Sequence, residues 1–387
     1  MEKKLLPAIL ILVGLIFSTL FSFNQFAKNT ISNFSVIDLT RLPTTENHIN
    51  ISQFASKITY LPLESRKECL IGPGARFDLF DSIIVSSAHH QILTFESKNG
   101  KFLKSIGEYG NGPNGYMNSR SSFIKNGEII ITALGWDFSL IEFSTNGEIL
   151  CKLKFNKSPR SIAWLRDNLY AIYYEKQSNS DSIRLQIYDS NKKKIVSTFY
   201  DHRKFKDGPK RTTNFGAFFY YEKNKLFIKE FFNDTVFQIT MNKLIPAIEF
   251  KSGKYSPPFF EKHKFDYLQY HNIQTILETE QLIFFELYLK KRGYNCYFDK
   301  RTNQIKIPNY KDLQINGFEN DVDGFMPFYP TTISNRNELI GFLEPYKIKK
   351  WFDENPDKAA KLPSHLQKLR NIKESDNPVV MIVKLKD

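Results

Sequence analysis

Short apolar segments alternate with polar turns along most of the chain, and residues 91–116 show the pattern most clearly. Residues 91–96 (QILTFE) and 101–106 (KFLKSI) have the length and the apolar content of β-strands. They flank Asn99-Gly100. Asn-Gly between apolar segments is a strong hairpin signal, because a type I′ turn requires positive φ at both central residues. We therefore predict a β-hairpin here, followed by a glycine-rich loop at 107–116.

The same hairpin pattern recurs along the chain. Each copy has an aromatic or aliphatic strand, a polar turn that contains asparagine, and a second apolar strand. Further copies occupy residues 140–153, 185–199, 235–250 and 294–307. The turn asparagines, at positions 99, 146, 191, 242 and 303, are separated by 47, 45, 51 and 61 residues. Periods of roughly 40–50 residues with about four strands each are typical of propeller blades.

The segments between these hairpins complete the blades. A strand pair at 78–87 and apolar stretches at 128–133, 168–174, 225–229 and 281–287 supply inner strands. A sixth blade can be assembled from residues 331–343 and 378–386, and strands from the N-terminal side, at 34–39 and 58–63, then help to close the ring and remove its exposed edge. We predict an all-β fold, a six-bladed β-propeller, over residues 31–387.

Two insertions interrupt the repeat. Residues 252–272 are aromatic and basic, with a Pro-Pro break. Residues 344–376 are the helical region, which we place inside the last blade as a short helical insertion near the C-terminus. Asn355-Pro356 indicates an N-cap followed by proline at the first helical position, and Pro363-Ser364 indicates the start of a second helix.

Residues 1–30 form a separate membrane-directed segment. Residues 5–23 are uncharged and follow Lys3 and Lys4. As a helix this stretch would be about 28 Å long, close to the thickness of a bilayer core, and the lysines place its start in the cytoplasm. It is long for the core of a signal peptide, and no clear cleavage site follows. We expect either an uncleaved N-terminal membrane anchor or a cleaved signal segment, with the remainder exported in both cases.

The chain is basic, with a formal net charge of +13 from 54 basic and 41 acidic residues. The basic residues are scattered, apart from the run Lys192-Lys193-Lys194. A solvated basic surface is one interpretation; attraction to polyanions such as anionic glycans, phospholipid head groups or nucleic acid is the other. Export argues against nucleic acid. The odd number of cysteines, three without C-x-x-C spacing, argues against a disulfide framework and a zinc site.

Four segments carry a family resemblance. They are FESKNGKFLKSIGEYGNGPNGY (95–116), FFNDTVFQI (231–239), GFENDVDGFMPFYP (317–330) and ESDNPVVMIVKLK (374–386). Together and in this order they resemble the six-bladed β-propeller proteins of bacterial envelopes, which are distantly related to NHL-repeat propellers and are often lipoproteins. The resemblance spans about residues 34–387.

The chain departs from the family pattern in two places. Gly115, preceded by Asn114, stands where a glutamate is usual before Tyr116, and the lipid-attachment cysteine of many relatives is missing. The resemblance implies the fold and a location in the bacterial cell envelope. It implies no reaction, because members of the family largely lack an assigned activity.

The motifs that suggest specific chemistry have simpler explanations. Gly110, Gly112 and Gly115 match G-x-G-x-x-G, but that motif binds a dinucleotide only where a helix follows, and here Pro113 and a strand-like stretch follow. A blade-to-blade connection is the better interpretation, and no cofactor is predicted. No H-x-x-x-H, H-E-x-x-H or G-x-S-x-G motif occurs, and no catalytic residue is assigned.

A metal site is also weakly indicated. Asp321 and Asp323 before Gly324 resemble the start of a calcium loop, but the twelfth position would be Pro330, where an EF-hand requires glutamate. Asp321 and Asp323 are therefore weak candidates for a non-EF-hand site, and a solvated turn is the alternative.

The binding candidates lie in two aromatic segments. They are Tyr109 and Tyr116 in the glycine-rich loop, and Lys254, Tyr255, His263 and Tyr267 in the insertion 252–272. Stacking on sugars or bases is one interpretation, and packing over a propeller face is the other.

The sequence as a whole favours a non-catalytic binding or scaffold propeller outside the cytoplasmic membrane. Its ligand would be a glycan, a peptide or a protein, and the membrane would be contacted through residues 5–23. The alternative is a propeller enzyme, a lyase or a hydrolase, with its site at the mouth of the central channel.

Overall fold

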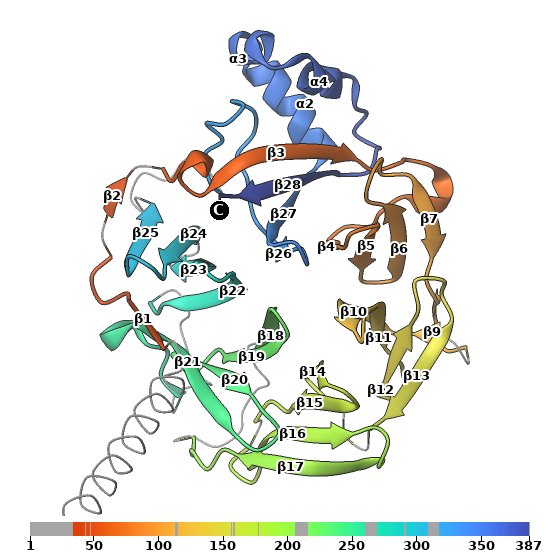
Figure 1. The fold of residues 1–387 in the computed structure, drawn as a ribbon, viewed down its shortest axis with the longest axis vertical. Helices are drawn as coiled ribbons and strands as arrows, with labels where there is room; N and C mark the ends of the chain where they lie inside the picture. The colour runs from red at the N-terminus through yellow and green to blue at the C-terminus, as the bar shows by residue number, and fades with distance from the viewer. Residues whose placement is uncertain are drawn as a thin grey trace, which may run out of the picture.

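The computed structural model describes residues 34–42, 44–46, 48–112, 115–155, 157, 159–176, 178–205, 216–259, 269–289, 292–308 and 317–386. Six sheets of four or five strands stand around a common axis (Figure 1). The predicted six-bladed β-propeller is confirmed. The membrane-directed residues 5–23 lie outside the described part of the chain. Within the described part, no helix is both long and apolar enough to cross a bilayer.

Blades 1 to 3 each consist of four consecutive antiparallel strands. The strands are β4 (Arg76–Leu79), β5 (Ile83–Ala88), β6 (Gln91–Glu96) and β7 (Phe102–Ser105) in blade 1; β10 (Asn118–Lys125), β11 (Glu128–Leu134), β12 (Ser139–Phe143) and β13 (Ile149–Lys154) in blade 2; and β14 (Ser161–Arg166), β15 (Leu169–Tyr173), β16 (Ile183–Asp189) and β17 (Lys194–Tyr200) in blade 3. The first strand of each blade lies nearest the axis and the last forms the rim, so the repeated hairpins are the outer two strands (Figure 1).

Blades 4 to 6 follow the same plan, and each also takes a strand from the N-terminal side. The strands are β18 (Ala217–Glu222), β19 (Lys225–Glu230), β20 (Thr235–Ile239), β21 (Leu244–Lys251) and β1 (Ser35–Asp38) in blade 4; β22 (Asn272–Glu278), β23 (Leu282–Leu289), β24 (Arg292–Asp299), β25 (Gln304–Pro308) and β2 (Thr44–Glu46) in blade 5; and β26 (Thr332–Ile333), β27 (Glu338–Leu343), β28 (Val379–Leu385) and β3 (Ala55–Pro62) in blade 6.

Of the two N-terminal strands predicted to close the ring, only the one at 58–63 does so. β3 pairs antiparallel with β28 and forms the outer strand of blade 6. β1 and β2 instead pair parallel with β21 and β25, as fifth strands outside blades 4 and 5, which the sequence did not predict. The start of the described chain therefore follows the rim of three blades (Figure 1).

The core is divided among the junctions between adjacent blades. The described residues contain six buried apolar clusters, and each joins two neighbouring sheets. Val85 of blade 1 packs with Ile131 and Phe143 of blade 2, for example, and all three are fully buried. Inner strands are thus covered on both faces, which explains why β5 and β15 are apolar with little alternation.

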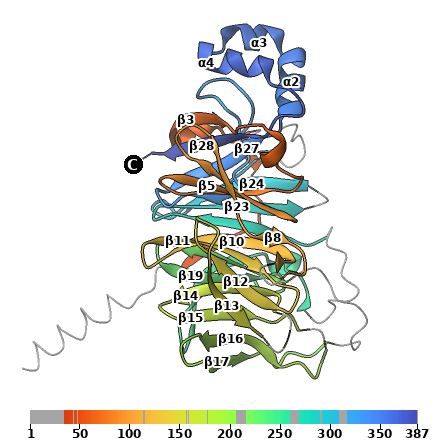
Figure 2. The same cartoon turned by 90° about the vertical axis from the view of Figure 1, so that its right-hand side faces the viewer.

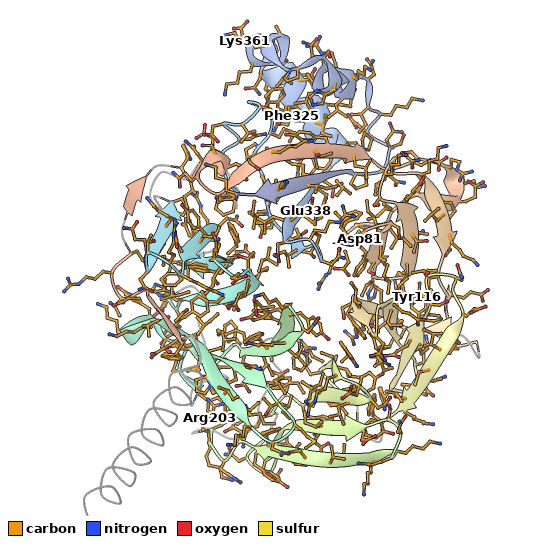
Figure 3. All side chains as sticks on the ribbon, in the orientation of Figure 1. Asp81, Tyr116, Arg203, Phe325, Glu338 and Lys361 are labelled. Carbon is orange, nitrogen blue, oxygen red and sulfur yellow. The ribbon has the colours of Figure 1, made fainter. Side chains whose placement is uncertain are left out.

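The predicted helical insertion joins β27 to β28. It consists of α2 (Pro345–Glu354), α3 (Pro356–Lys361), α4 (Ser364–Gln367) and the short 3₁₀ helix η5 (Lys368–Asn371). The helices stand beyond the rim of blade 6, with Lys361 at their far end (Figures 2 and 3). Phe325 packs against Trp351, with ring centroids 4.7 Å apart, and so links the helices to the blade 5–6 cluster.

The expected cap at Asn355 is not formed in the predicted way. Pro356 is the first residue of α3, as predicted, but the side chain of Asn355 makes no N-cap hydrogen bond. Its Nδ2 donates to the carbonyl oxygen of Trp351 at 2.9 Å. Asn355 therefore satisfies the end of α2, because the two helices follow each other with no linker.

The prediction of a type I′ turn at Asn99-Gly100 is wrong. Only Gly100 has positive φ, at 71°. The amide of Gly100 donates to the carbonyl of Glu96, and the amide of Glu96 donates to the carbonyl of Lys101, so the turn spans residues 97–100. A longer loop that ends in a left-handed residue serves the hairpin equally well. In blade 5 the left-handed position is taken by Asn303 itself, at 55°.

Candidate functional site

One face of the propeller carries both the blade-to-blade connections and the loops between the second and third strands. Because the strands of each blade are antiparallel, the blade-to-blade connections and the loops between second and third strands emerge on the same side. We call this side the connection face. Propeller scaffolds hold such loops on rigid strands, and binding residues are disproportionately placed on loops of this kind.

Exposed aromatic rings meet on the connection face of blades 1 and 2. His90 comes from the β5–β6 turn, Tyr109 from the short strand β8 (Glu108–Tyr109) and Trp136 from the β11–β12 loop. The ring of Tyr109 lies 4.0 Å from that of His90 and 6.4 Å from that of Trp136. Tyr109 is 45% exposed and Trp136 is 47% exposed. We call these three residues the ring cluster.

The β11–β12 loop holds Trp136 through a compact network. The hydroxyl of Ser139 donates to Oδ1 of Asp137 at 2.6 Å, and this hydrogen bond lowers the pKa of Asp137. Phe138 in the same loop has a φ of 60° and is 42% exposed. The left-handed backbone of Phe138 is strained, and the exposure of its apolar ring to water is unfavourable. Backbone strain of this kind is often found at binding sites.

Tyr116 lies in the core rather than on the face. It belongs to β9 (Gly115–Tyr116), which pairs parallel with β8, and its ring packs against Phe143 between blades 1 and 2 (Figure 3). Its side chain is 2% exposed, and burial raises its pKa to about 12. Gly115 explains the departure from the family pattern, because a Cβ there would lie 2.0 Å from the carbonyl oxygen of Gly110.

The insertion 252–272 supplies two of the predicted residues to the described surface. Lys254 and Tyr255 lie in the short 3₁₀ helix η3 (Gly253–Tyr255), where Tyr255 is 36% exposed and stacks on the buried His271 at 4.9 Å. Burial lowers the pKa of His271 to about 4. The other two candidates, His263 and Tyr267, lie outside the described residues. No described ring contact joins Tyr255 to the ring cluster.

A network of buried charges lies between blades 3 and 4 on the same face. Nε of Arg184 donates to Glu230 at 2.9 Å, and Arg203 forms a bidentate pair with Asp201 through bonds of 2.9 Å and 2.7 Å. Burial acts to raise the pKa of Asp201, but the bonds and charge of Arg203 outweigh it and lower the pKa. Arg203 also lies 4.0 Å from the ring centre of Phe259. The cavity beside these charges measures about 30 Å³.

Residues 34–384 match a family described as a domain of unknown function, DUF4934. The chain belongs to the DUF4934 family. A search of curated protein sequences matches none of them.

Solved structures share the fold of this DUF4934 propeller. A candidate exported protein from Bacteroides fragilis NCTC 9343 is 17% identical, with a TM-score of 0.67 over 92% of this chain and 100% of the other. A member of the DUF4221 family from Bacteroides vulgatus ATCC 8482 is 12% identical, with a TM-score of 0.52 over 89% and 100%. These findings support the resemblance to Bacteroides propellers, and a relationship to NHL-repeat propellers stays a proposal.

The DUF4934 segment 317–330 fastens the N-terminal part of the chain. Asp321 accepts hydrogen bonds from the backbone amide and the hydroxyl of Ser52. Asp323 accepts from the hydroxyl of Tyr60 in β3 at 2.9 Å, and Asn320 donates to the same hydroxyl at 2.9 Å. The two weak metal candidates thus have protein partners. Within the described residues, no three His, Cys, Asp or Glu side chains are placed to hold a metal ion.

The segment 374–386 also stabilises ring closure, through hydrogen bonds to the residues that follow β3. Asn377 is 2% exposed, and its Nδ2 donates to the carbonyls of Glu64 and Cys69 at 2.6 Å and 2.8 Å. Its Oδ1 accepts from the amide of Ile71 at 2.8 Å. Both segments therefore secure ring closure, which is a structural role.

Sequence reasoning missed Trp136 and Phe138. The only signal was a tryptophan and a phenylalanine around Asp137, between two apolar strands, where a polar turn is expected. His89 and His90 were not among the predicted binding residues either; their rings lie 4.1 Å apart, and that of His90 lies beside Tyr109.

Proposed function

We propose that this DUF4934 propeller is a non-catalytic binding module that takes a glycan on its connection face. The carrying observation is the ring cluster, in which exposed rings from three separate loops meet. An aromatic ring can pack against the apolar C–H face of a sugar while the sugar hydroxyls stay hydrated. Monomeric proteins rarely expose such groups together without a partner.

The module is proposed to work outside the cytoplasmic membrane. The uncharged residues 5–23 support this location, and so does the similarity of fold to a candidate exported protein. Whether that segment stays as an anchor or is cleaved is decided by sequencing the N-terminus of the mature protein from a membrane fraction. An intact N-terminus indicates the anchor.

An enzyme is the second candidate function, and the buried charges between blades 3 and 4 are the observation that would favour it. A cavity of about 30 Å³ holds roughly one water molecule rather than a substrate. Both carboxylates are engaged by arginines, Glu230 by Arg184 and Asp201 by Arg203. A general acid or base needs a carboxyl that exchanges its proton near the working pH. The network therefore fits a role in joining two blades.

The test compares two aromatic truncations. Trp136→Ala removes a ring from the ring cluster, and Tyr346→Ala removes a ring that is 53% exposed on α2, away from the cluster. On a glycan array, the wild type and Tyr346→Ala should bind alike, and Trp136→Ala should bind about 10-fold more weakly. Equal binding by all three proteins would overturn the site, and binding only to peptides would overturn the glycan.

A further inference from the structure

An open groove lies at the outer junction between blades 2 and 3. Its volume is about 450 Å³. It is bounded by the end of β13, by the segment that follows β13, and by β16 and the start of β17. A volume of this size is within the range of pockets that take small ligands, roughly 300–1,000 Å³. The groove is separate from the ring cluster, since none of the cluster residues lines it.

Lysines from both blades converge on this groove. Lys154 and Lys157 come from the blade 2 side, and Lys193 and Lys194 from blade 3. None of the described residues that line the groove is an aspartate or a glutamate. Several positive charges gathered on one concave surface attract an anion, and an anionic ligand could pair with more than one of them.

The nearby carboxylates offset little of this charge. Asp189 pairs with Lys192 at 3.5 Å, so the first lysine of the basic run is directed to a partner in its own blade. Asp181 approaches Lys157 only to 4.0 Å, and that lysine side chain is 62% exposed. Within the described residues, Lys154, Lys193 and Lys194 form no ion pair.

Aromatic rings line the groove beneath the lysines. Tyr188 is half-buried and meets Phe155 edge-to-face, with centroids 5.8 Å apart. Nζ of Lys157 lies 5.7 Å from the ring centre of Tyr174. Burial raises the pKa of Tyr174, so its phenol stays neutral and adds no negative charge. The groove thus combines ring surfaces with cations.

Other junctions show that such a groove is not a necessary gap of the fold. Between blades 6 and 1 the equivalent position is filled, because the amide of Glu64, just after β3, donates to the carbonyl of Gly100 at 2.9 Å. Between blades 1 and 2, Nζ of Lys104 donates to the carbonyl of Asn146 at 2.7 Å. Between blades 2 and 3, Lys193 takes the left-handed turn position, with φ of 51°, and the groove stays open.

We propose that the blade 2–3 groove is a second binding site, for the carboxylate- or sulfate-bearing sugars of an acidic polysaccharide. Ammonium groups at its edge pair with the acid groups, and the half-buried ring of Tyr188 accepts the C–H face of a sugar. The concave shape favours a chain that enters the groove over a flat bilayer surface. This site does not depend on the glycan site of the connection face.

The test uses the full chain and a charge-matched control. Lys154→Glu/Lys194→Glu reverses two groove lysines, and Lys358→Glu/Lys361→Glu reverses two exposed lysines of α3, far from the ring (Figure 3). Both variants have the same net charge. Polygalacturonate carries carboxylates and heparin carries sulfates as well, and neutral dextran and anionic phospholipid vesicles complete the probes.

The groove variant should bind at least one acidic polysaccharide about 10-fold or more weakly than the wild type, and the α3 variant should change affinity by less than about 2-fold. The affinity of the wild type should fall as salt is raised. Tyr188→Ala should weaken binding about 3-fold at constant salt, and Trp136→Ala should leave it unchanged. Equal loss in both lysine variants, or binding to vesicles but to neither polysaccharide, would overturn the proposal. So would a wild type that binds neither acidic polysaccharide.

Discussion

The outer junctions between blades 6 and 1 and between blades 2 and 3 occupy equivalent places in the ring but are built in opposite ways. At the first, the buried side chain of Asn377 has partners for both of its polar atoms. At the second, lysines of two blades line a common groove, and none of its described lining residues is an aspartate or a glutamate. At the first junction the polar groups form hydrogen bonds that close the ring. At the second junction the lysine side chains line a groove that is open to a ligand. The family segments 317–330 and 374–386 therefore stabilise ring closure, whereas the segment 95–116 also supplies Tyr109 to the ring cluster.

The largest effect on stability is expected from removing the side chain of Asn377. In Asn377→Ala, the carbonyls of Glu64 and Cys69 and the amide of Ile71 lose their partner in a buried site. We expect the free energy of unfolding to fall by about 4 kcal/mol, as several buried groups are left unpaired. Urea denaturation measures the change. Asn371→Ala, at an exposed position of η5, is the control and should stay within about 0.5 kcal/mol. Equal stability of the two variants would contradict the assigned role.

A third junction, between blades 4 and 5, adds a dependence on pH. His271 is 3% exposed and its pKa is lowered to about 4 by burial, so the folded state keeps the neutral ring. Between pH 6.5 and 4 the unfolded chain binds a proton that the folded chain does not, so stability falls as pH falls. The loss should reach about 3 kcal/mol near pH 4 and be absent above pH 6.5.

His271→Phe keeps a ring for the stacking contact with Tyr255 and removes the titration. Urea denaturation from pH 7 to pH 4 should show a smaller loss of stability for this variant than for the wild type. If the two proteins lose stability in parallel, His271 does not carry the effect.

The smallest expected effect has the opposite sign. Lys154→Ala/Lys194→Ala removes two exposed positive charges from the open junction, where both lysines line the groove. We expect the free energy of unfolding to stay unchanged or to rise by up to about 0.5 kcal/mol, and the gain should shrink at high salt. Lys358→Ala/Lys361→Ala controls for the lowered net charge. A loss above about 1 kcal/mol in the groove variant alone would mean that these lysines stabilise the junction.

The sequence predicted the fold well because the repeat is local. A strand pair and its turn lie within about 15 residues, so the apolar pattern shows each outer hairpin directly. The closing role of β3 followed from the need to cover an edge. The pairing of β1 with β21 and of β2 with β25 could not be predicted, because the sequence of a single strand does not indicate which distant strand it pairs with.

The proposed binding surfaces were harder to predict because they are assembled across blades. The run Lys192-Lys193-Lys194 was visible in the sequence, but only the structure divides it, pairing Lys192 with Asp189 and placing the other two beside Lys154. Tyr109 and Tyr116 look equivalent in the sequence, yet Tyr109 is exposed and Tyr116 is buried against Phe143 between the blades. Sequence spacing does not encode which ring of a loop faces inward.

The pairing of β3 with β28 also sets an order of events in folding. Ala55 lies opposite Leu385, so the contact that closes the ring joins residues 330 positions apart in the sequence. Blades 1 to 5 can form from neighbouring hairpins, but the ring stays open until the final strand has been synthesised. Contacts between distant parts of a chain form slowly because a long loop must close first. During that interval the nascent chain carries unpaired strand edges, and it is then most open to pairing with another chain.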